Sequence, residues 1–155
     1  MSNSPLALVF TAETTLIHDG RPFDGIPELL RGLRSAGFPI CVVTRWPRER
    51  WDASTARLDL GPFARVDADL QGGTTALADA LARAAAAVEL SPDLVVHIAG
   101  SPDDLDAARA AGMRVGEALW PGIALAPDGT ALAIPTPEWR FARPADVTRT
   151  FAAWC

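Results

Sequence analysis

Short runs of consecutive apolar residues alternate along this chain with longer segments in which apolar residues recur at helical spacing. An apolar run bounded by polar residues is typical of a strand buried on both faces, and helices between such runs indicate parallel strands joined by crossovers. The sequence therefore predicts an α/β fold, a doubly wound parallel sheet with helices on both faces. The runs expected to form strands are residues 6–10, 40–43, 64–66, 94–98 and 113–115.

The segments between these runs carry helix start and stop signals. Proline in the first turn and glycine just past the end are the usual signals, and a threonine can cap the first turn. The expected helices are one from residue 26 to Gly37, a short one ending near residue 58, a long alanine-rich one from Thr74 or Thr75 to about residue 88, and one from Pro102 to Gly112.

The tail from residue 121 has a different character, because five prolines interrupt it. Two short apolar runs, residues 123–125 and 131–134, flank the turn sequence Ala-Pro-Asp-Gly-Thr and predict a C-terminal β-hairpin. A short closing helix is expected over residues 145–154. We expect one domain over residues 1–155, with its core in about residues 6–120 and the hairpin and closing helix in 121–155.

Composition and charge exclude several classes of function. The chain has a net charge of −5, and its fourteen basic residues are all arginine, so no basic stripe favours nucleic acid and no lysine can serve in catalysis. No apolar run is long enough to cross a membrane, and the N-terminus lacks the pattern of a signal peptide, so a cytoplasmic protein is expected. Cys41 lies in an apolar run and is expected in the core, without a disulfide.

The loops that follow three of the expected strands should meet at one edge of the sheet. Ligands of doubly wound sheets bind at the carboxyl ends of the strands. These loops are residues 11–15, 44–46 and 99–104, and we call the edge that they form the rim.

The same three places carry a known pattern of residues. Residues 9–16 read VFTAETTL, residues 40–44 read ICVVT, and residues 98–113 read IAGSPDDLDAARAAGM. They are similar in spacing to three motifs of the haloacid dehalogenase-like (HAD) superfamily: hhhhDxDGT, an apolar strand ending in Ser or Thr, and hVGDSxxDhxAAxxAGM. The chain resembles that superfamily over roughly residues 6 to 120.

The resemblance assigns catalytic roles to four positions, but two of them hold unusual residues. Thr11 stands where the family has its nucleophilic aspartate, and Glu13 stands where it has the general acid/base. Thr44 matches the residue that binds the transferred phosphoryl group, and Asp104 matches the last aspartate of the fourth motif.

Two further functional side chains of the family are missing. The fourth-motif aspartate that helps to hold magnesium falls at Gly100, and the third-motif lysine falls near Thr74 or Thr75. A threonine hydroxyl cannot replace a carboxylate as a magnesium ligand. We therefore expect no metal and no cofactor, and magnesium enters only if an unusual hydrolase mechanism holds.

Other polar residues of the rim are candidates for ligand binding. The hydroxyl groups and one arginine can form an anion-binding pocket, or they can simply satisfy loop and cap hydrogen bonds. These candidates are Thr14, Thr15, Arg45, Trp46, Ser101 and Asp103.

The segment from Arg45 to Trp51 holds three arginines and two tryptophans. Such residues are enriched at binding hot spots, so the segment either contacts a partner or ligand, or is a surface helix whose tryptophans cover the sheet. His97 lies inside an apolar run and is expected to be buried and hydrogen-bonded. His18 lies in the loop where the family places a mobile flap, which makes it a candidate for substrate contact.

The leading hypothesis is a HAD-like pseudoenzyme that binds a protein partner or a phosphorylated ligand at the rim through Arg45, Trp46 and Trp51. The alternative is an atypical hydrolase in which Glu13 acts as base and Asp103 and Asp104 supply charge. A third reading is an assembly subunit that forms a homo-oligomer. All three fit a HAD-like domain without a cap, because the segments between the motifs are too short for a second domain.

Overall fold

One parallel sheet organises the part of the chain that the structure describes. The structure is a computed structural model, and it describes residues 6–71, 73–120 and 139–152. The strands of the sheet are β1 (Ala7–Thr11), β4 (Ile40–Val43), β5 (Arg65–Asp67), β6 (Val95–Ala99), β7 (Arg114–Ala118) and β8 (Trp139–Phe141). Their order is β5-β4-β1-β6-β7-β8, and every neighbouring pair is parallel.

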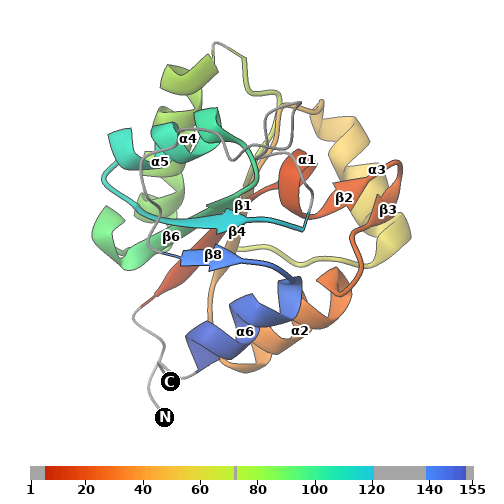
Figure 1. The fold of residues 1–155 in the computed structure, drawn as a ribbon. Helices are drawn as coiled ribbons and strands as arrows, with labels where there is room; N and C mark the ends of the chain where they lie inside the picture. Colours follow the sequence, from red (N-terminus) through yellow and green to blue (C-terminus); the bar gives the residue numbers. More distant parts are fainter. Residues whose placement is uncertain (1–5, 72, 121–138, 153–155) are drawn as a thin grey trace, which may run out of the picture.

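Helices cover both faces of this sheet, as Figure 1 shows. They are α1 (Ala12–Thr15), α2 (Ile26–Ser35), α3 (Arg48–Leu58), α4 (Gly73–Ala87), α5 (Pro102–Ala110) and α6 (Pro144–Ala152), with a 3-10 turn, η1 (Pro92–Leu94). The predicted doubly wound α/β fold is confirmed, and so are the five strand runs expected from the sequence. None of the helices in the described ranges is long and apolar enough to cross a membrane.

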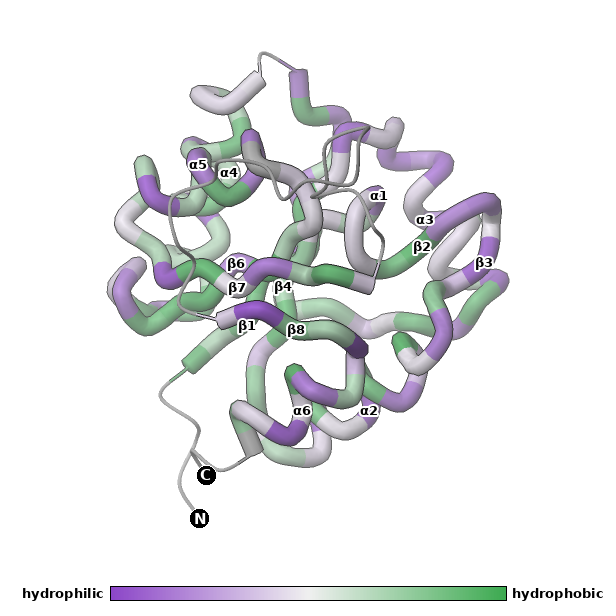
Figure 2. Tube along the Cα trace, viewed as in Figure 1, coloured by the Kyte–Doolittle hydropathy of each residue, from purple (hydrophilic) through white to green (hydrophobic). Residues whose placement is uncertain are grey.

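The alternation of side chains along β1 explains why two helical layers are needed. Leu8 and Phe10 point to the core that α2 and α6 cover, whereas Ala7 and Val9 point to the core that α4 and α5 cover. Successive residues of a strand face opposite sides, so a strand that is apolar at every position must be covered on both. Hydrophobic residues accordingly colour much of the central strands in Figure 2.

The segment after β1 differs from the polar loop that the sequence predicted. Ala12–Thr15 forms the single turn of α1, and β2 (Ile17–His18) pairs with β3 (Arg21–Pro22) in an antiparallel ribbon. Asp19 and Gly20 connect the two strands, with φ values of 51° and 74°. Asp-Gly with positive φ at both positions is a strong short-range hairpin signal, and sequence analysis missed it.

The end of the chain also differs from expectation. Trp139–Phe141 forms β8, which extends the sheet beside β7 and was not predicted. Only three residues make this strand, which is too short a run to stand out in a proline-rich tail. The expected closing helix is confirmed as α6, whereas the predicted β-hairpin over residues 123–134 lies outside the described residues.

Among the described residues, Trp51 is the largest fully buried side chain, so it should contribute strongly to stability. It is 2% exposed and packs against Phe63, with the ring centroids 5.6 Å apart. We expect Trp51→Ala to lower the free energy of unfolding by about 3–5 kcal/mol, because a large cavity would remain. Trp46→Ala, at a half-buried position, is the control and should cost roughly half as much or less. Equal losses in urea unfolding would contradict this assignment.

Candidate functional site

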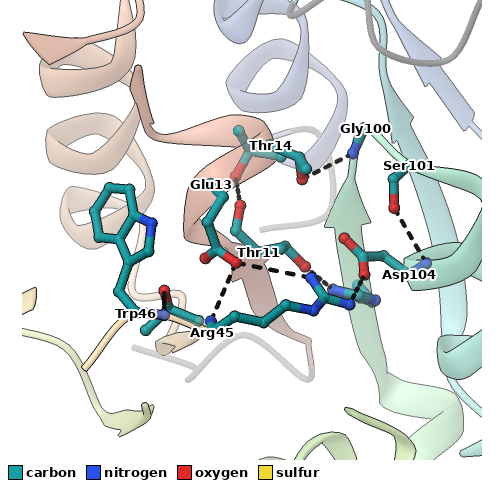
Figure 3. Close-up of polar contacts among 11 residues, drawn as sticks. Thr11, Glu13, Thr14, Arg45, Trp46, Gly100, Ser101 and Asp104 are labelled. Carbon is teal, nitrogen blue, oxygen red and sulfur yellow. Dashed lines mark hydrogen bonds and ion pairs between the residues drawn. The ribbon is translucent and has the colours of Figure 1, made fainter. Parts of the chain in front are cut away.

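The three predicted rim segments lie side by side because their strands are neighbours in the sheet. β1 lies between β4 and β6, so Thr11, Thr44 and Gly100 all stand at the same edge. Residues from these three strand ends and from α1 and α5 contact one another there, as Figure 3 shows. The sequence prediction of a shared rim is in agreement with this geometry.

Thr11 is buried and hydrogen-bonded to a histidine of the next strand. Its hydroxyl Oγ1 lies 2.8 Å from Nε2 of His97, and the two residues are 1% and 0% exposed. Burial lowers the pKa of His97 to about 4, although the charge of Asp104 acts in the opposite direction. His97 is therefore neutral near pH 7, as expected for a buried, hydrogen-bonded residue.

The hydroxyl groups of the rim accept or donate hydrogen bonds within the rim itself. Thr14 Oγ1 accepts from the backbone N–H of Gly100 at 3.2 Å, and Thr44 Oγ1 accepts from that of Trp46 at 3.0 Å. Thr15 Oγ1 donates to the carbonyl of Thr11 at 2.7 Å. These contacts match the reading in which the hydroxyls satisfy loop and cap hydrogen bonds.

Ser101 plays the same part at the start of α5. Its Oγ accepts from the backbone N–H of Asp104 at 3.3 Å, which is the hydrogen bond of a helix N-cap. Its neighbour Asp103 is exposed, and its charge helps to raise the pKa of Arg45.

Arg45 is the centre of the charged contacts at the rim. Its guanidinium NH2 donates to Oδ1 of Asp104 at 3.0 Å, and its NH1 lies 3.7 Å from Oε2 of Glu13. The backbone N–H of Arg45 also donates to that Oε2, at 3.1 Å. The side chain of Asp104 is fully buried, that of Glu13 is 21% exposed and that of Arg45 is 44% exposed.

Each of these two carboxylates keeps one oxygen without a hydrogen-bond partner among the described residues. The atoms are Oε1 of Glu13 and Oδ2 of Asp104, and both are buried. Buried acceptors without a partner are rare in folded proteins and point to an unrecorded water, an ion or a functional role.

The two tryptophans after β4 have different environments. Trp46 is half-buried, and the guanidinium of Arg50 lies over its ring, 4.2 Å from the centroid. Trp51 is buried in the core, so the prediction that it contributes to a binding surface is wrong. In α3, Trp51 and Leu58 are two turns apart and therefore face the same side, a helical spacing that could have indicated a core position.

The two histidine predictions have different outcomes. His97 is buried as expected, but its pairing with Thr11 was not predicted, because sequence alone does not give the register of two neighbouring strands. His18 belongs to β2, is exposed, stacks on Phe23 at 5.6 Å and lies 3.3 Å from Asp19. A contact of His18 with a substrate stays a prediction.

A second charged cluster lies at the end of β5. Asp67 accepts two hydrogen bonds from Arg65, at 2.9 and 3.1 Å, and lies 3.6 Å from Nε of Arg83. Both carboxylate oxygens of Asp67 therefore have partners, whereas Glu13 and Asp104 each have one oxygen with a partner and one without. Sequence analysis did not select these residues as a site.

The residues of the rim do not fit a magnesium ion. Magnesium takes hard oxygen ligands, commonly one or two carboxylates, in octahedral geometry. Thr11 and Gly100 supply no carboxylate, and the two carboxylates that remain already bind Arg45. Within the described ranges, no group of three or more His, Cys, Asp or Glu residues is placed to hold a metal ion.

Comparisons with known proteins agree with the resemblance. A model of haloacid dehalogenase-like hydrolases matches residues 7–112, more than half of the chain. Among solved structures, a HAD-superfamily hydrolase from Ehrlichia chaffeensis is similar, with a TM-score of 0.76 and 13% identity over 99% of each chain. No curated protein matches the sequence significantly.

Two other similar structures are longer than this chain. A predicted phosphoglycolate phosphatase from Haemophilus somnus has a TM-score of 0.66 and 20% identity, over 84% of this chain and 57% of its own. A haloacid dehalogenase-like family protein from Streptococcus pneumoniae has a TM-score of 0.65 and 18% identity, over 84% of this chain and 60% of its own. At these identities, the likeness shows a shared fold.

The buried, neutral state of His97 predicts how stability depends on pH. Its pKa of about 4 in the folded state lies below the ordinary value of 6.5, so the unfolded state binds a proton first as the pH falls. Stability is complete above about pH 6.5 and should decline progressively towards pH 4. We expect His97→Gln to flatten this decline in urea unfolding at several pH values, whereas His18→Gln, at an exposed position, should not. An unchanged decline in His97→Gln would contradict the assignment.

Proposed function

We propose that this chain, which belongs to the haloacid dehalogenase-like hydrolase family, does not transfer phosphoryl groups and instead binds a protein partner at its open rim. The observation that carries the proposal is the state of Thr11. Its hydroxyl is buried and is hydrogen-bonded to a histidine that is itself fully buried. A nucleophile must reach the atom that it attacks, and Thr11 is only 1% exposed in this structure.

The backbone N–H groups of the rim support the same conclusion. Phosphate sites commonly use free N–H groups at loops and helix N-termini. Here the N–H groups of Arg45, Trp46, Gly100 and Asp104 all donate to side-chain oxygens of the rim. These four donors are therefore already engaged, which favours a protein partner over a phosphorylated ligand among the two occupants expected from the sequence.

The surface proposed for the partner consists of Arg45, Trp46 and Arg50. Tryptophan and arginine are the residues most enriched at binding hot spots. The stacking of Arg50 on Trp46 holds these two side chains together before binding, and the backbone N–H of Trp46 donates to Thr44 Oγ1. Pre-ordered side chains lose less conformational entropy when a partner binds.

A rim without a cap domain after β1 also suits a macromolecular partner. Between β1 and α2, the chain forms only the single turn of α1 and the β2–β3 ribbon. No further domain is inserted at that point of the chain to close the rim over a small molecule.

A second candidate function is the atypical hydrolase, and one contact favours it. The distance of 2.8 Å between Thr11 Oγ1 and His97 Nε2 is that of a nucleophile and its base. The mechanism expected from the sequence used Glu13 as base and did not pair Thr11 with His97. Because Thr11 is buried, this candidate requires a rearrangement that exposes its hydroxyl.

A phosphatase assay separates the two candidates. We expect the pure protein to release no phosphate from a panel of phosphate esters, with or without magnesium, above the rate of the Thr11→Ala variant. The reason is that the hydroxyl of Thr11 is buried and that position 11 carries no carboxylate to act as the nucleophile. Turnover that is well above background and is lost in Thr11→Ala would establish the hydrolase and overturn the proposal.

A binding experiment tests the partner surface. The wild type should retain a partner protein from a lysate of the source organism. Arg50→Ala and Trp46→Ala should bind that partner with an affinity about 30-fold or more lower, as is typical of hot-spot residues. Arg31→Ala, an exposed arginine on α2, is the matched control and should retain it. Light scattering shows whether the partner is a second copy of this chain. Equal retention by all four proteins would contradict the proposal.

A further inference from the structure

The carboxylates of Glu13 and Asp104 meet on one cation, and that cation belongs to the protein. The guanidinium of Arg45 lies between them, 3.0 Å from Oδ1 of Asp104 and 3.7 Å from Oε2 of Glu13. Figure 3 shows this side chain extending across the rim from the end of β4 to the start of α5. It connects three segments that are far apart in the sequence.

Asp104 requires such a cation on physical grounds. Its side chain is fully buried, and an isolated buried carboxylate is strongly unfavourable unless a charge or several hydrogen bonds compensate it. The hydrogen bond from Arg45 engages only Oδ1, while Oδ2 has no partner in the described part of the chain. Arg45 is thus the cation that makes this burial tolerable.

We propose that Arg45 is the resident cation of this rim, and that its guanidinium takes the place of a divalent metal ion and excludes one. This inference deepens the proposed function and rests on it in one respect, since both require a rim without metal-dependent chemistry. A divalent ion must lie within about 2.0–2.6 Å of its carboxylate oxygens. It could take the place between Oε2 of Glu13 and Oδ1 of Asp104 only if the guanidinium left these two oxygens.

The guanidinium of Arg45 uses only part of the acceptor capacity of the two carboxylates. A planar guanidinium can bind both oxygens of one carboxylate, as Arg65 does with Asp67. At the rim, Arg45 binds one oxygen of each carboxylate and leaves Glu13 Oε1 and Asp104 Oδ2 free. Two carboxylates with spare oxygens therefore remain as ligands once the guanidinium is removed.

The backbone of Arg45 makes the exclusion stronger. Its N–H holds the same Oε2 of Glu13 that the guanidinium attracts, so Glu13 is held at two points by one residue. A tethered cation also cannot dissociate, whereas a metal ion binds according to its concentration. The rim therefore keeps its charge balance whatever the magnesium concentration.

The test removes the charge of Arg45 and keeps most of its length. We expect Arg45→Met to bind Mn²⁺ or Mg²⁺, detected by titration calorimetry and by the Mn²⁺ electron paramagnetic resonance signal, at least tenfold more tightly than the wild type. Arg45→Lys keeps a cation and should remain unable to bind metal. Arg83→Met, which removes an arginine from the Asp67 cluster, is the matched control and should also remain silent.

The outcomes that overturn the inference are specific. Metal binding by the wild type as tight as by Arg45→Met would do so, and so would a folded Arg45→Met variant that binds no metal. Adding Glu13→Gln to Arg45→Met should abolish the new binding. If Arg45→Met is unstable without metal, added Mg²⁺ should raise its urea midpoint of unfolding and leave that of the wild type unchanged. No rise in the midpoint of Arg45→Met would count against the inference.

The same measurements separate this inference from the proposed function. Phosphate-ester turnover by metal-free wild type would overturn the proposed function and leave the role of Arg45 intact. Magnesium binding by a wild type that has no turnover would overturn the role of Arg45 and leave the proposed function intact.

Discussion

The buried carboxylate of Asp104 is the constraint around which the rim is organised. A charge with a fully buried side chain needs compensation, and the structure supplies it from one arginine just after β4. Because Arg45 also binds Glu13, the ends of β1 and β4 and the start of α5 are held together by charge. The rim is a set of polar contacts centred on Arg45 at one edge of the sheet.

The architecture of the sheet does not depend on the polar residues of the rim. The sheet and its two helical layers depend on apolar residues of β1, β4 and β6, none of which is a catalytic candidate. The hydroxyl of Thr11 is one that a buried, neutral His97 can satisfy. A threonine at this position is therefore compatible with a stable core, since it brings no unpaired charge.

Much of the fold could be predicted from the sequence, because a strand buried on both faces leaves an apolar run that is hard to mistake. The three rim segments followed from those runs, since the carboxyl ends of parallel strands meet at one edge. The contact of Thr11 with His97 could not be predicted in the same way. It depends on β6 lying next to β1, with Val9 opposite His97 in the register, and the sequence does not state the strand order. Trp51 was misplaced because its helical phase was not weighed, and β8 was missed because three residues carry little periodicity.

The partners of Arg45 also lay beyond the sequence. Glu13 and Asp104 are 32 and 59 residues away along the chain, and either could have faced solvent. The central claim is that the protein supplies its own cation at this rim. A crystal structure from a crystal soaked in Mn²⁺ with a phosphate mimic, with anomalous diffraction to locate manganese, tests that claim most directly. The account predicts the guanidinium between Glu13 and Asp104 and no manganese peak at the rim. A manganese ion bound to those carboxylates, with Arg45 turned away, would contradict it.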